Sequence, residues 1–200
     1  MPNEKNNNIA VLILAAGAST RMGQSKQLLP WGETTLLNHA IAQANYVSEH
    51  IFVVLGANKD SIEKTLSNEV SVIFNPSWKQ GMGTSIAVGV SKIQKGHLFD
   101  ALLIMLGDQP LLDGSYLNEL NQLFGTSKNR IVATSYGDKN GVPAFFHNSL
   151  FNELRKLSKD YGARSLMQRH VQYLSSLNPN GKEIDIDTPE TYNQLLVRSK

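Results

Sequence analysis

An abrupt change from large apolar residues to small residues near the start of the chain constrains the fold most strongly. The run Ile9–Leu14 is apolar on both faces and partly β-branched, which is typical of a central strand covered by helices on each side. Small residues follow at once, from Ala15 to Ser19. We therefore expect the first strand of a parallel sheet, ending in a loop with almost no side-chain bulk.

The loop after this strand carries the first functional signal. Its backbone N–H groups can approach an anion closely because its side chains are small. Arg21 and Lys26 add positive charge just downstream, at a strand end where open α/β sheets bind ligands. The pattern favours phosphate binding, with a tight strand-to-helix turn as the alternative. No Gly-Lys-Ser or Gly-Lys-Thr closes the loop, and the third glycine of the dinucleotide fingerprint is missing.

The rest of the chain alternates between predicted strands and helices, as in a doubly wound α/β fold. The predicted strands are Ile51–Leu55, Val70–Phe74, Ala101–Leu106, Arg130–Tyr136, Gly141–Phe146 and Ile184–Asp187. We expect the segment 141–146 to be antiparallel and near the edge of the sheet. The predicted helices run from Thr34 or Thr35 to about Tyr46, from Asp60 or Ser61 to Leu66, from Thr84 or Ser85 to Lys95, from near Asp113 to Phe124, from Asn148 or Ser149 to Leu157, after Arg164 to His170, and from Thr188 onwards.

Length and composition indicate one globular domain. The 200 residues are 41% hydrophobic and 18% charged, which is typical of a chain that buries its own core. We expect residues 1–8 to form a flexible tail and residues 9–200 to form the domain. The formal net charge is +2 and no basic stripe is present, so we expect neither nucleic acid nor a membrane as a partner.

Other chemistry is excluded by residue type. The chain has no cysteine, which rules out disulfides, thiolate metal sites and a cysteine nucleophile. The histidines lack metal-ligand spacing, and no Ser-His-Asp set is indicated, so hydrolase chemistry has no support. Glu4 beside Lys5 and a short apolar run argue against a signal peptide. We therefore expect a cytoplasmic protein.

Asp108 is a candidate metal ligand. It follows the apolar strand 101–106 and stands between Gly107 and Gln109. It could cap the next helix, but Asp113 and Ser115 are better placed to do so. Because Mg²⁺ is typically held by one or two carboxylates with substrate phosphates and water, the position favours a magnesium ligand.

Two more segments allow a structural and a functional interpretation. The segment 75–85 is either a loop around a half-buried Trp78 or a helix start whose glycines Gly81 and Gly83 hold a base edge or a phosphate against the backbone. Near the C-terminus, Asp185 and Asp187 precede a helix that begins at Thr188-Pro189. Either aspartate could cap this helix, although Thr188 is also available.

Together these motifs resemble the nucleotidyltransferases, and most closely the molybdenum cofactor cytidylyltransferases. The resemblance runs from Leu14 to Glu190. Its strings are Leu14-Ala15-Ala16-Gly17-x-Ser19-x-Arg21-Met22-Gly23-x-x-Lys26-x-Leu28-Leu29-Pro30, the small residues Gly81, Gly83 and Ser85, Gly107-Asp108-Gln109-Pro110, Asp160-x-Gly162-Ala163-Arg164 and Asp185-x-Asp187-Thr188-Pro189. It implies a three-layer α/β/α fold with a Rossmann-like, mostly parallel sheet of the nucleotidyltransferase type.

The resemblance also implies roles for single residues. Those for nucleotide binding are Leu14, Ala15, Ala16, Gly17, Arg21, Lys26, Gly81, Ser85 and Asp108, of which Arg21, Lys26 and Asp108 are the catalytic set. Those for the acceptor are Gln109, Gly141, Pro143 and Arg164, although Asp160 and Arg164 could simply be a surface i,i+4 pair. Mg²⁺ would be held by Asp108 and Asp187, with Asp185 as the fallback. The family often has Gly-His-Pro near the acceptor, where this chain has Val142 in place of the histidine.

The reaction that the resemblance implies is transfer of CMP from CTP to the phosphate of molybdenum-bound molybdopterin, with release of pyrophosphate. A molybdoenzyme that receives the product is a further expected partner. Two alternatives stay open at this point. One is an enzyme of the same fold with another base, such as GTP, or another acceptor, such as a sugar phosphate. The other is a carrier of the molybdenum cofactor without turnover.

Overall fold

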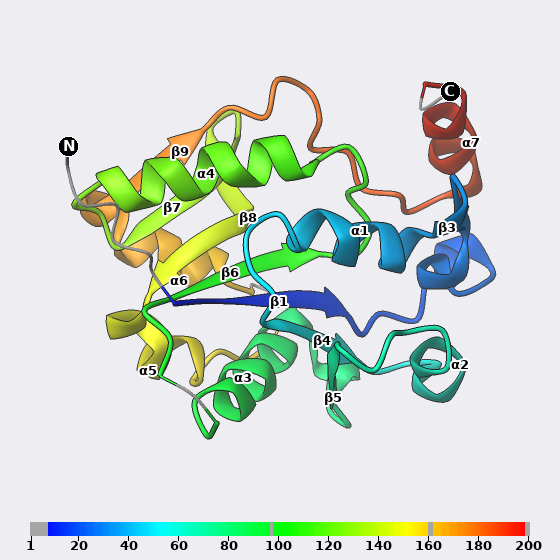
Figure 1. Ribbon diagram of the computed structural model, residues 1–200, viewed down its shortest axis with the longest axis horizontal. Helices are drawn as coiled ribbons and strands as arrows, with labels where there is room; N and C mark the ends of the chain where they lie inside the picture. Colours follow the sequence, from blue (N-terminus) through cyan, green and yellow to red (C-terminus); the bar gives the residue numbers. More distant parts are fainter. Residues whose placement is uncertain (1–7, 97, 160–161, 199–200) are drawn as a thin grey trace.

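The computed structural model describes residues 8–96, 98–159 and 162–198, so the predicted tail 1–8 lies outside the described residues except for Asn8. A seven-stranded sheet with the order β5-β4-β1-β6-β8-β7-β9 forms the centre (Figure 1). Its strands are β1 (Ile9–Ala15), β4 (Ile51–Leu55), β5 (Ser71–Phe74), β6 (Ala101–Leu106), β7 (Ile131–Tyr136), β8 (Lys139–His147) and β9 (Leu174–Leu177).

The strand β1 is central, as the sequence predicts. It pairs in parallel with β4 on one side and with β6 on the other. Every residue of β1 is buried. Val11 and Ile13 belong to one hydrophobic cluster and Leu12 and Leu14 to a second, because successive side chains of a strand point to opposite faces of the sheet.

Helices cover both faces of this sheet (Figure 1). The helices α1 (Leu36–Ala44) and α4 (Gly114–Thr126) supply the first cluster, and α3 (Met82–Ile93), α5 (Phe151–Leu154) and α6 (Arg164–Arg169) supply the second. The short helix α2 (Lys59–Glu63) follows β4. The predicted three-layer α/β/α fold with a mostly parallel sheet is confirmed.

The C-terminal helix α7 (Pro189–Arg198) packs against the segment that follows β1. A third cluster joins Leu195 and Ile186 to Met22, Leu29 and Trp31. Trp31 lies in β2 (Pro30–Trp31), which forms a small antiparallel pair with β3 (Thr34–Thr35). This cluster brings the end of the described chain to the loop after β1.

Two predicted helix caps are confirmed. The side chain of Thr35 accepts a hydrogen bond from the Asn38 backbone N–H, and that of Asp113 accepts one from the Tyr116 backbone N–H at 2.9 Å. Each cap satisfies a backbone donor that the first turn of a helix leaves unpaired. Asp113 therefore has the capping role that Asp108 could otherwise have taken.

The expected start of α3 at Thr84 or Ser85 is wrong. The helix begins at Met82, because Gly81 adopts φ 109° and turns the chain directly into the first helical residue. Only glycine adopts such a backbone conformation without strain. The Thr84 hydroxyl donates to the Gly81 carbonyl at 2.8 Å and so does not cap the helix N-terminus.

Two expectations about strands also need correction, and one further strand is not predicted. The segment 184–187 is not a strand; it crosses the end of the sheet, and the Ile186 N–H donates to the Asp108 carbonyl at 2.9 Å. Its alternating pattern arises because Ile186 is fully buried between two aspartates. The strand β8 is antiparallel to β6 and β7, as expected, but lies inside the sheet and not near its edge. The edge beyond β7 is β9, which was not predicted because its sequence Leu-Ser-Ser-Leu is short and half polar.

Some helices are also shorter than the hydrophobic pattern suggests. The helix α2 begins at Lys59 and ends at Glu63, and α5 spans Phe151–Leu154 after a 3₁₀ turn at Asn148–Leu150. Helix ends fray and are set by local caps more than by periodicity. These differences do not affect the position of the site.

Gly83 offers a test of how closely α3 is packed. Its N–H donates to the Lys159 carbonyl at 2.9 Å, and a Cβ at this position would lie 2.7 Å from the Ser158 carbonyl oxygen. We expect Gly83→Ala to lower the free energy of unfolding by about 1–3 kcal/mol, the usual cost of overpacking. Urea denaturation measures this value.

Gly125→Ala is the matched control for this substitution. Gly125 lies within α4, and a Cβ there would meet nothing within 4 Å. Replacing a helical glycine by alanine in open space should raise stability by about 0.5–1 kcal/mol. If both variants were stabilised alike, the backbone contact at Gly83 would not be as tight as described.

Candidate active site

A cavity of about 330 Å³ lies at the carboxyl ends of β1 and β6. This is the edge at which open α/β sheets bind ligands. The lining residues come from the loop after β1, from the start of α3 and from the end of β6. They are Leu14, Ala15, Ala16, Gly17, Lys26, Gln27, Trp78, Gly81, Met82, Ser85, Leu106, Gly107 and Asp108.

The loop after β1 is held in shape by Gln27, which is only 3% exposed. The Gln27 amide donates to the Ala15 carbonyl at 2.9 Å and to the Gly17 carbonyl at 3.0 Å. The Ser19 hydroxyl accepts from the Lys26 N–H at 3.2 Å. These hydrogen bonds hold the loop from its protein-facing side. Its small side chains leave the side that faces the cavity open. A Cβ on Gly17 would meet nothing within 4 Å.

Lys26 links two carboxylates that lie far apart in the sequence. Its ammonium contacts Asp108, and it donates to Asp187 Oδ1 at 2.7 Å. Arg21 contacts the other oxygen of Asp187, also at 2.7 Å. The Lys26 side chain is 15% exposed, the Asp108 side chain 16% and the Arg21 side chain 69%, so the charge cluster extends from a buried centre to the surface.

Burial and charge shift the pKa values of this cluster. Burial raises the pKa of Asp108 above its usual range, although Lys26 opposes this shift. Burial also favours neutral Lys26, but the carboxylates outweigh it and raise the Lys26 pKa, so the ammonium stays charged. For Asp187, burial is outweighed by Lys26 and Arg21, and its pKa is lowered.

Asp185 and Gln109 extend the cluster from an exposed carboxylate to a buried amide. The Gln109 amide donates to Asp185 Oδ1 at 2.8 Å and to the Tyr136 hydroxyl at 2.7 Å. Gln109 is 5% exposed, and both of its amide hydrogens are used within the protein. This arrangement ties the C-terminal segment to the end of β6 and to β7.

The structure brings together most of the predicted nucleotide-binding residues. Eight of the nine line the cavity. The ninth, Arg21, lies outside it and contacts Asp187, which in turn contacts the lining residue Lys26. Gly83 lies outside the cavity, against the carbonyls of Ser158 and Lys159. The predicted acceptor residues are more scattered. Gln109 points into the protein, Gly141 and Pro143 lie in β8, and Arg164 is exposed at the start of α6. The alternative pairing of Arg164 with Asp160 involves a residue outside the described ranges.

Sequence reasoning missed Gln27 and Met82 as lining residues, and it left the role of Trp78 open. All three now contribute to the cavity wall. The signal for Gln27 is weak, because a glutamine beside a lysine normally indicates a solvated surface. Only its burial and its bonds to two loop carbonyls identify it.

The donor set fits a divalent cation. Asp108 Oδ1 is buried and has no hydrogen-bond partner, and both Asp108 and Asp187 already contact one cationic atom, the Lys26 ammonium nitrogen. Carboxylate oxygens are ligands that Mg²⁺ and Mn²⁺ prefer. Within residues 8–96, 98–159 and 162–198, no cluster of three or more acidic, histidine or cysteine side chains suggests a metal cage, so substrate oxygens or water would complete the coordination.

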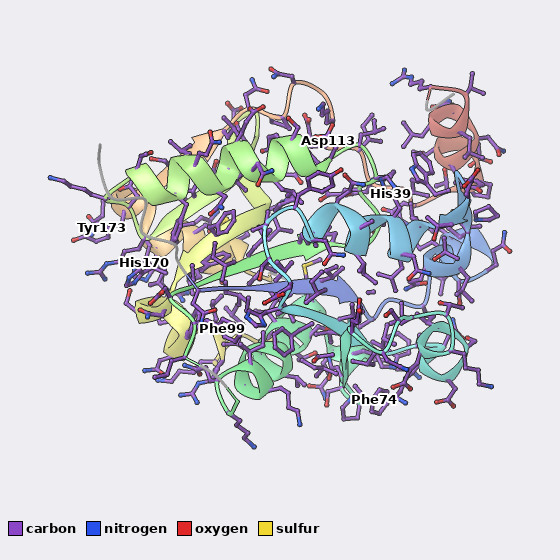
Figure 2. The ribbon with its side chains drawn as sticks, viewed as in Figure 1. His39, Phe74, Phe99, Asp113, His170 and Tyr173 are labelled. Carbon is purple, nitrogen blue, oxygen red and sulfur yellow. The ribbon has the colours of Figure 1, made fainter. Side chains whose placement is uncertain are left out.

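Among the described residues, the four histidines His39, His50, His147 and His170 do not line this cavity. Figure 2 shows His170 near the left end of the molecule and His39 to the right of its centre. The His39 ring contacts the Pro110 carbonyl at 3.1 Å, and His170 contacts Glu153 at 2.9 Å. In addition, none of the helices in the described part of the chain has the length and apolar character needed to cross a membrane.

An α/β fold with a small-residue loop, two cations and acidic residues at the same sheet edge is typical of proteins that bind phosphorylated ligands. The chain belongs to the MobA-like NTP transferase domain family, whose family model matches residues 11–173. The match includes the loop, Lys26, Ser85 and Asp108. Asp185 and Asp187 lie beyond it.

Known proteins support this assignment. The molybdenum cofactor cytidylyltransferase of Escherichia coli (strain K12) is 35% identical over 106 residues, which cover 52% of this chain and 53% of that protein. The chain thus spans about half the length of this relative. The purine catabolism protein PucB of Bacillus subtilis (strain 168) is 29% identical over 196 residues, covering 92% of this chain and 94% of that protein.

A solved structure of similar fold holds a metal. The manganese complex of Rv0371c from Mycobacterium tuberculosis H37Rv has a TM-score of 0.77 and 26% identity, and the alignment covers 95% of this chain and 98% of that one. Proteins similar to this chain therefore include a cytidylyltransferase, a purine catabolism protein and one solved with manganese.

Asp185 gives the site a predicted pH dependence in the metal-free protein. Burial, followed by the nearby Asp108 charge, raises the pKa of Asp185 from 3.8 to about 6. The folded protein then binds this proton more tightly than the unfolded chain, so stability from Asp185 is present below about pH 4 and is lost as the pH rises through about 6.

Asp185→Asn should remove this loss, because the asparagine side chain is neutral and its oxygen can still accept from Gln109. We expect the variant to melt at a higher temperature than the parent at pH 8 in EDTA, and the difference to shrink as the pH falls toward 4. Thermal unfolding across this pH range measures the effect. A difference that does not change with pH would show that ionisation of Asp185 is not its cause.

Proposed function

We propose that this protein transfers CMP from CTP to the phosphate of molybdenum-bound molybdopterin and releases pyrophosphate. The observation that carries the proposal is the joint position of Lys26, Asp108 and the loop 15–17 in one cavity. Similarity to a cytidylyltransferase supports the choice of CTP. The proposal includes a cytoplasmic location, a molybdoenzyme as recipient of the product, and neither nucleic acid nor membrane as a partner.

The residues that line the cavity suit the transfer of a nucleotidyl group. Among the residues that the structure describes, no histidine and no Ser-His pair lines it, and the chain has no cysteine. Nucleotidyl transfer requires little more than positioning and charge neutralisation. In the proposed reaction an acceptor phosphate oxygen attacks the α-phosphorus of CTP, and the bond from that phosphorus to the leaving pyrophosphate breaks. The loop N–H groups of residues 15–17 bind phosphate oxygens and orient the α-phosphorus.

Lys26 and Arg21 stabilise the negative charge that develops on the leaving pyrophosphate. The raised pKa of Lys26 keeps its ammonium charged for this role. Mg²⁺, held by Asp108 and Asp187, would neutralise charge on the phosphates of both substrates. Asp185 is the less suitable ligand, because its Oδ1 already accepts a hydrogen bond from Gln109, whereas Asp108 Oδ1 has no hydrogen-bond partner.

Gln109, Gly141, Pro143 and Arg164 remain proposed acceptor residues with unequal support. Gln109 would act on acceptor binding indirectly, because its amide links Asp185 of the C-terminal segment to Tyr136 of β7. The relative PucB, which matches most of the chain, favours a second candidate, a nucleotidyltransferase of this fold with another acceptor or base.

Pyrophosphate release tests the reaction and its base choice together. Purified protein with Mg²⁺ and molybdenum cofactor is assayed with CTP, GTP, ATP or UTP. We expect release with CTP and little with the other nucleotides. Release with GTP alone would show that the protein is a guanylyltransferase and not a cytidylyltransferase. If CTP binds in a titration but no pyrophosphate is released, molybdenum cofactor is not the acceptor substrate. If the cofactor binds and CTP does not, the protein is a carrier of the cofactor without turnover.

Asp108→Asn should nearly abolish turnover, by on the order of 10²- to 10³-fold, because the variant loses a preorganised charge at the reacting phosphates. Steady-state pyrophosphate release measures the loss. The matched control is Asp113→Asn, because Asp113 caps α4 away from the cavity and asparagine caps helices as well as aspartate does. The control should keep its turnover. An Asp108→Asn variant with most of its activity would contradict the metal role.

A further inference from the structure

Asn75 is fully buried behind the cavity wall, at 0% exposure. It follows the edge strand β5, and its backbone N–H donates to the Leu55 carbonyl at 2.9 Å. Its side-chain oxygen accepts from the Ser77 N–H at 2.9 Å, and its amide nitrogen donates to Thr84 Oγ1 and to Ser85 Oγ, each at 3.0 Å. Every donor of this side chain is therefore used.

The orientation of the Asn75 amide follows from these partners. The Ser77 N–H can only donate, so it must face the oxygen of the amide and not its nitrogen. The two amide hydrogens are then directed at the hydroxyls of Thr84 and Ser85. Both hydroxyls must offer a lone pair to Asn75, which leaves each with one hydrogen to direct elsewhere.

The two hydroxyls differ in where that hydrogen goes. Thr84 lies close to two acceptors, the Gly81 carbonyl at 2.8 Å and the Ser77 carbonyl at 3.1 Å. Ser85 makes no further hydrogen bond within the described residues; it is 4% exposed and lines the cavity. The hydrogen of Ser85 is therefore available to a ligand in the cavity.

We propose that Asn75 is a positioning residue that holds the Ser85 hydroxyl as a hydrogen-bond donor toward the nucleobase, and that it thereby selects cytosine over uracil. The proposal rests on the proposed function, since it requires a pyrimidine triphosphate in this cavity with its base against Ser85. The geometry behind it is independent of the acceptor substrate.

The two pyrimidines differ where such a donor matters. Cytosine presents a lone pair at its ring N3, whereas uracil carries a hydrogen there. A hydroxyl held as a donor pairs with the cytosine nitrogen and faces a second donor in uracil. A buried donor left without its partner loses binding by about 10- to 100-fold. Asn75 occupies one of the two lone pairs of the Ser85 oxygen. Turning the second lone pair toward uracil keeps this bond but leaves the Ser85 hydrogen without a partner among the described residues.

Asn75→Asp tests the direction of this bond. The carboxylate has the same shape as the amide but only accepts hydrogen bonds, so the Ser85 hydrogen would turn toward residue 75 and its lone pair toward the cavity. We expect the Kd for CTP divided by the Kd for UTP to rise by on the order of 10-fold or more, because CTP loses its donor and UTP gains an acceptor. Calorimetry with Mg²⁺ at pH 8 measures both constants. A general loss of affinity would affect both nucleotides and leave the ratio unchanged.

Ser85→Ala is the second variant, in case a carboxylate at position 75 prevents folding. It removes the donor itself and should lower the preference for CTP by about 10-fold while leaving the fold intact by circular dichroism. In the Ser85→Ala background, Asn75→Ala should cause no further change in the ratio, because the group that Asn75 orients is gone.

The outcomes separate the two proposals. If neither CTP nor UTP binds to the parent protein, the proposed function fails and the selection by Asn75 fails with it. If the parent prefers CTP and the ratio stays constant in Asn75→Asp and in Ser85→Ala, the proposed function survives and the role of Asn75 is overturned. A ratio that shifts in both variants supports the role of Asn75.

Discussion

The contact of the Lys26 ammonium with the carboxylates of Asp108 and Asp187 is the interaction on which the site depends. It joins the segment after the first strand, the end of β6 and the C-terminal segment at one point. Charges this buried are stable only when they are paired, so removal of one partner would leave another uncompensated. In the proposed reaction, phosphates and a divalent cation take over the same charges, which explains why anion-binding and cation-binding groups lie within contact of each other.

The protein around this contact keeps it in place. The sheet is covered on both faces, and the third cluster anchors α7 and Ile186 against Met22 and Trp31. Polar side chains then set the details: Gln27 shapes the loop, Gln109 holds Asp185, and Asn75 orients Ser85. Each of these amides is buried and uses both of its hydrogens, which explains why they are well suited to fix the direction of neighbouring groups.

The predictability of each feature depends on how local its cause is. The strand β1, its loop and Asp108 were predictable because a run that is apolar on both faces, followed by small residues, has few other structures open to it. The end of the chain was predicted less well, since 184–187 alternates like a strand but is held by the Asp108 carbonyl and by burial of Ile186. Likewise, the interior place of β8 depends on pairing with β7 and β9, which no local pattern encodes.

The sequence by itself determined the α/β class, the central strand and the residue types of the site, because hydrophobic periodicity and small-residue loops act over a few neighbouring residues. Only the tertiary structure decided that one ammonium meets two aspartates, that Gln27 supports the loop, and that Ser85 has a hydrogen to offer. These facts depend on contacts between segments separated by up to 161 positions, and on which donors and acceptors have already been used when the chain is folded.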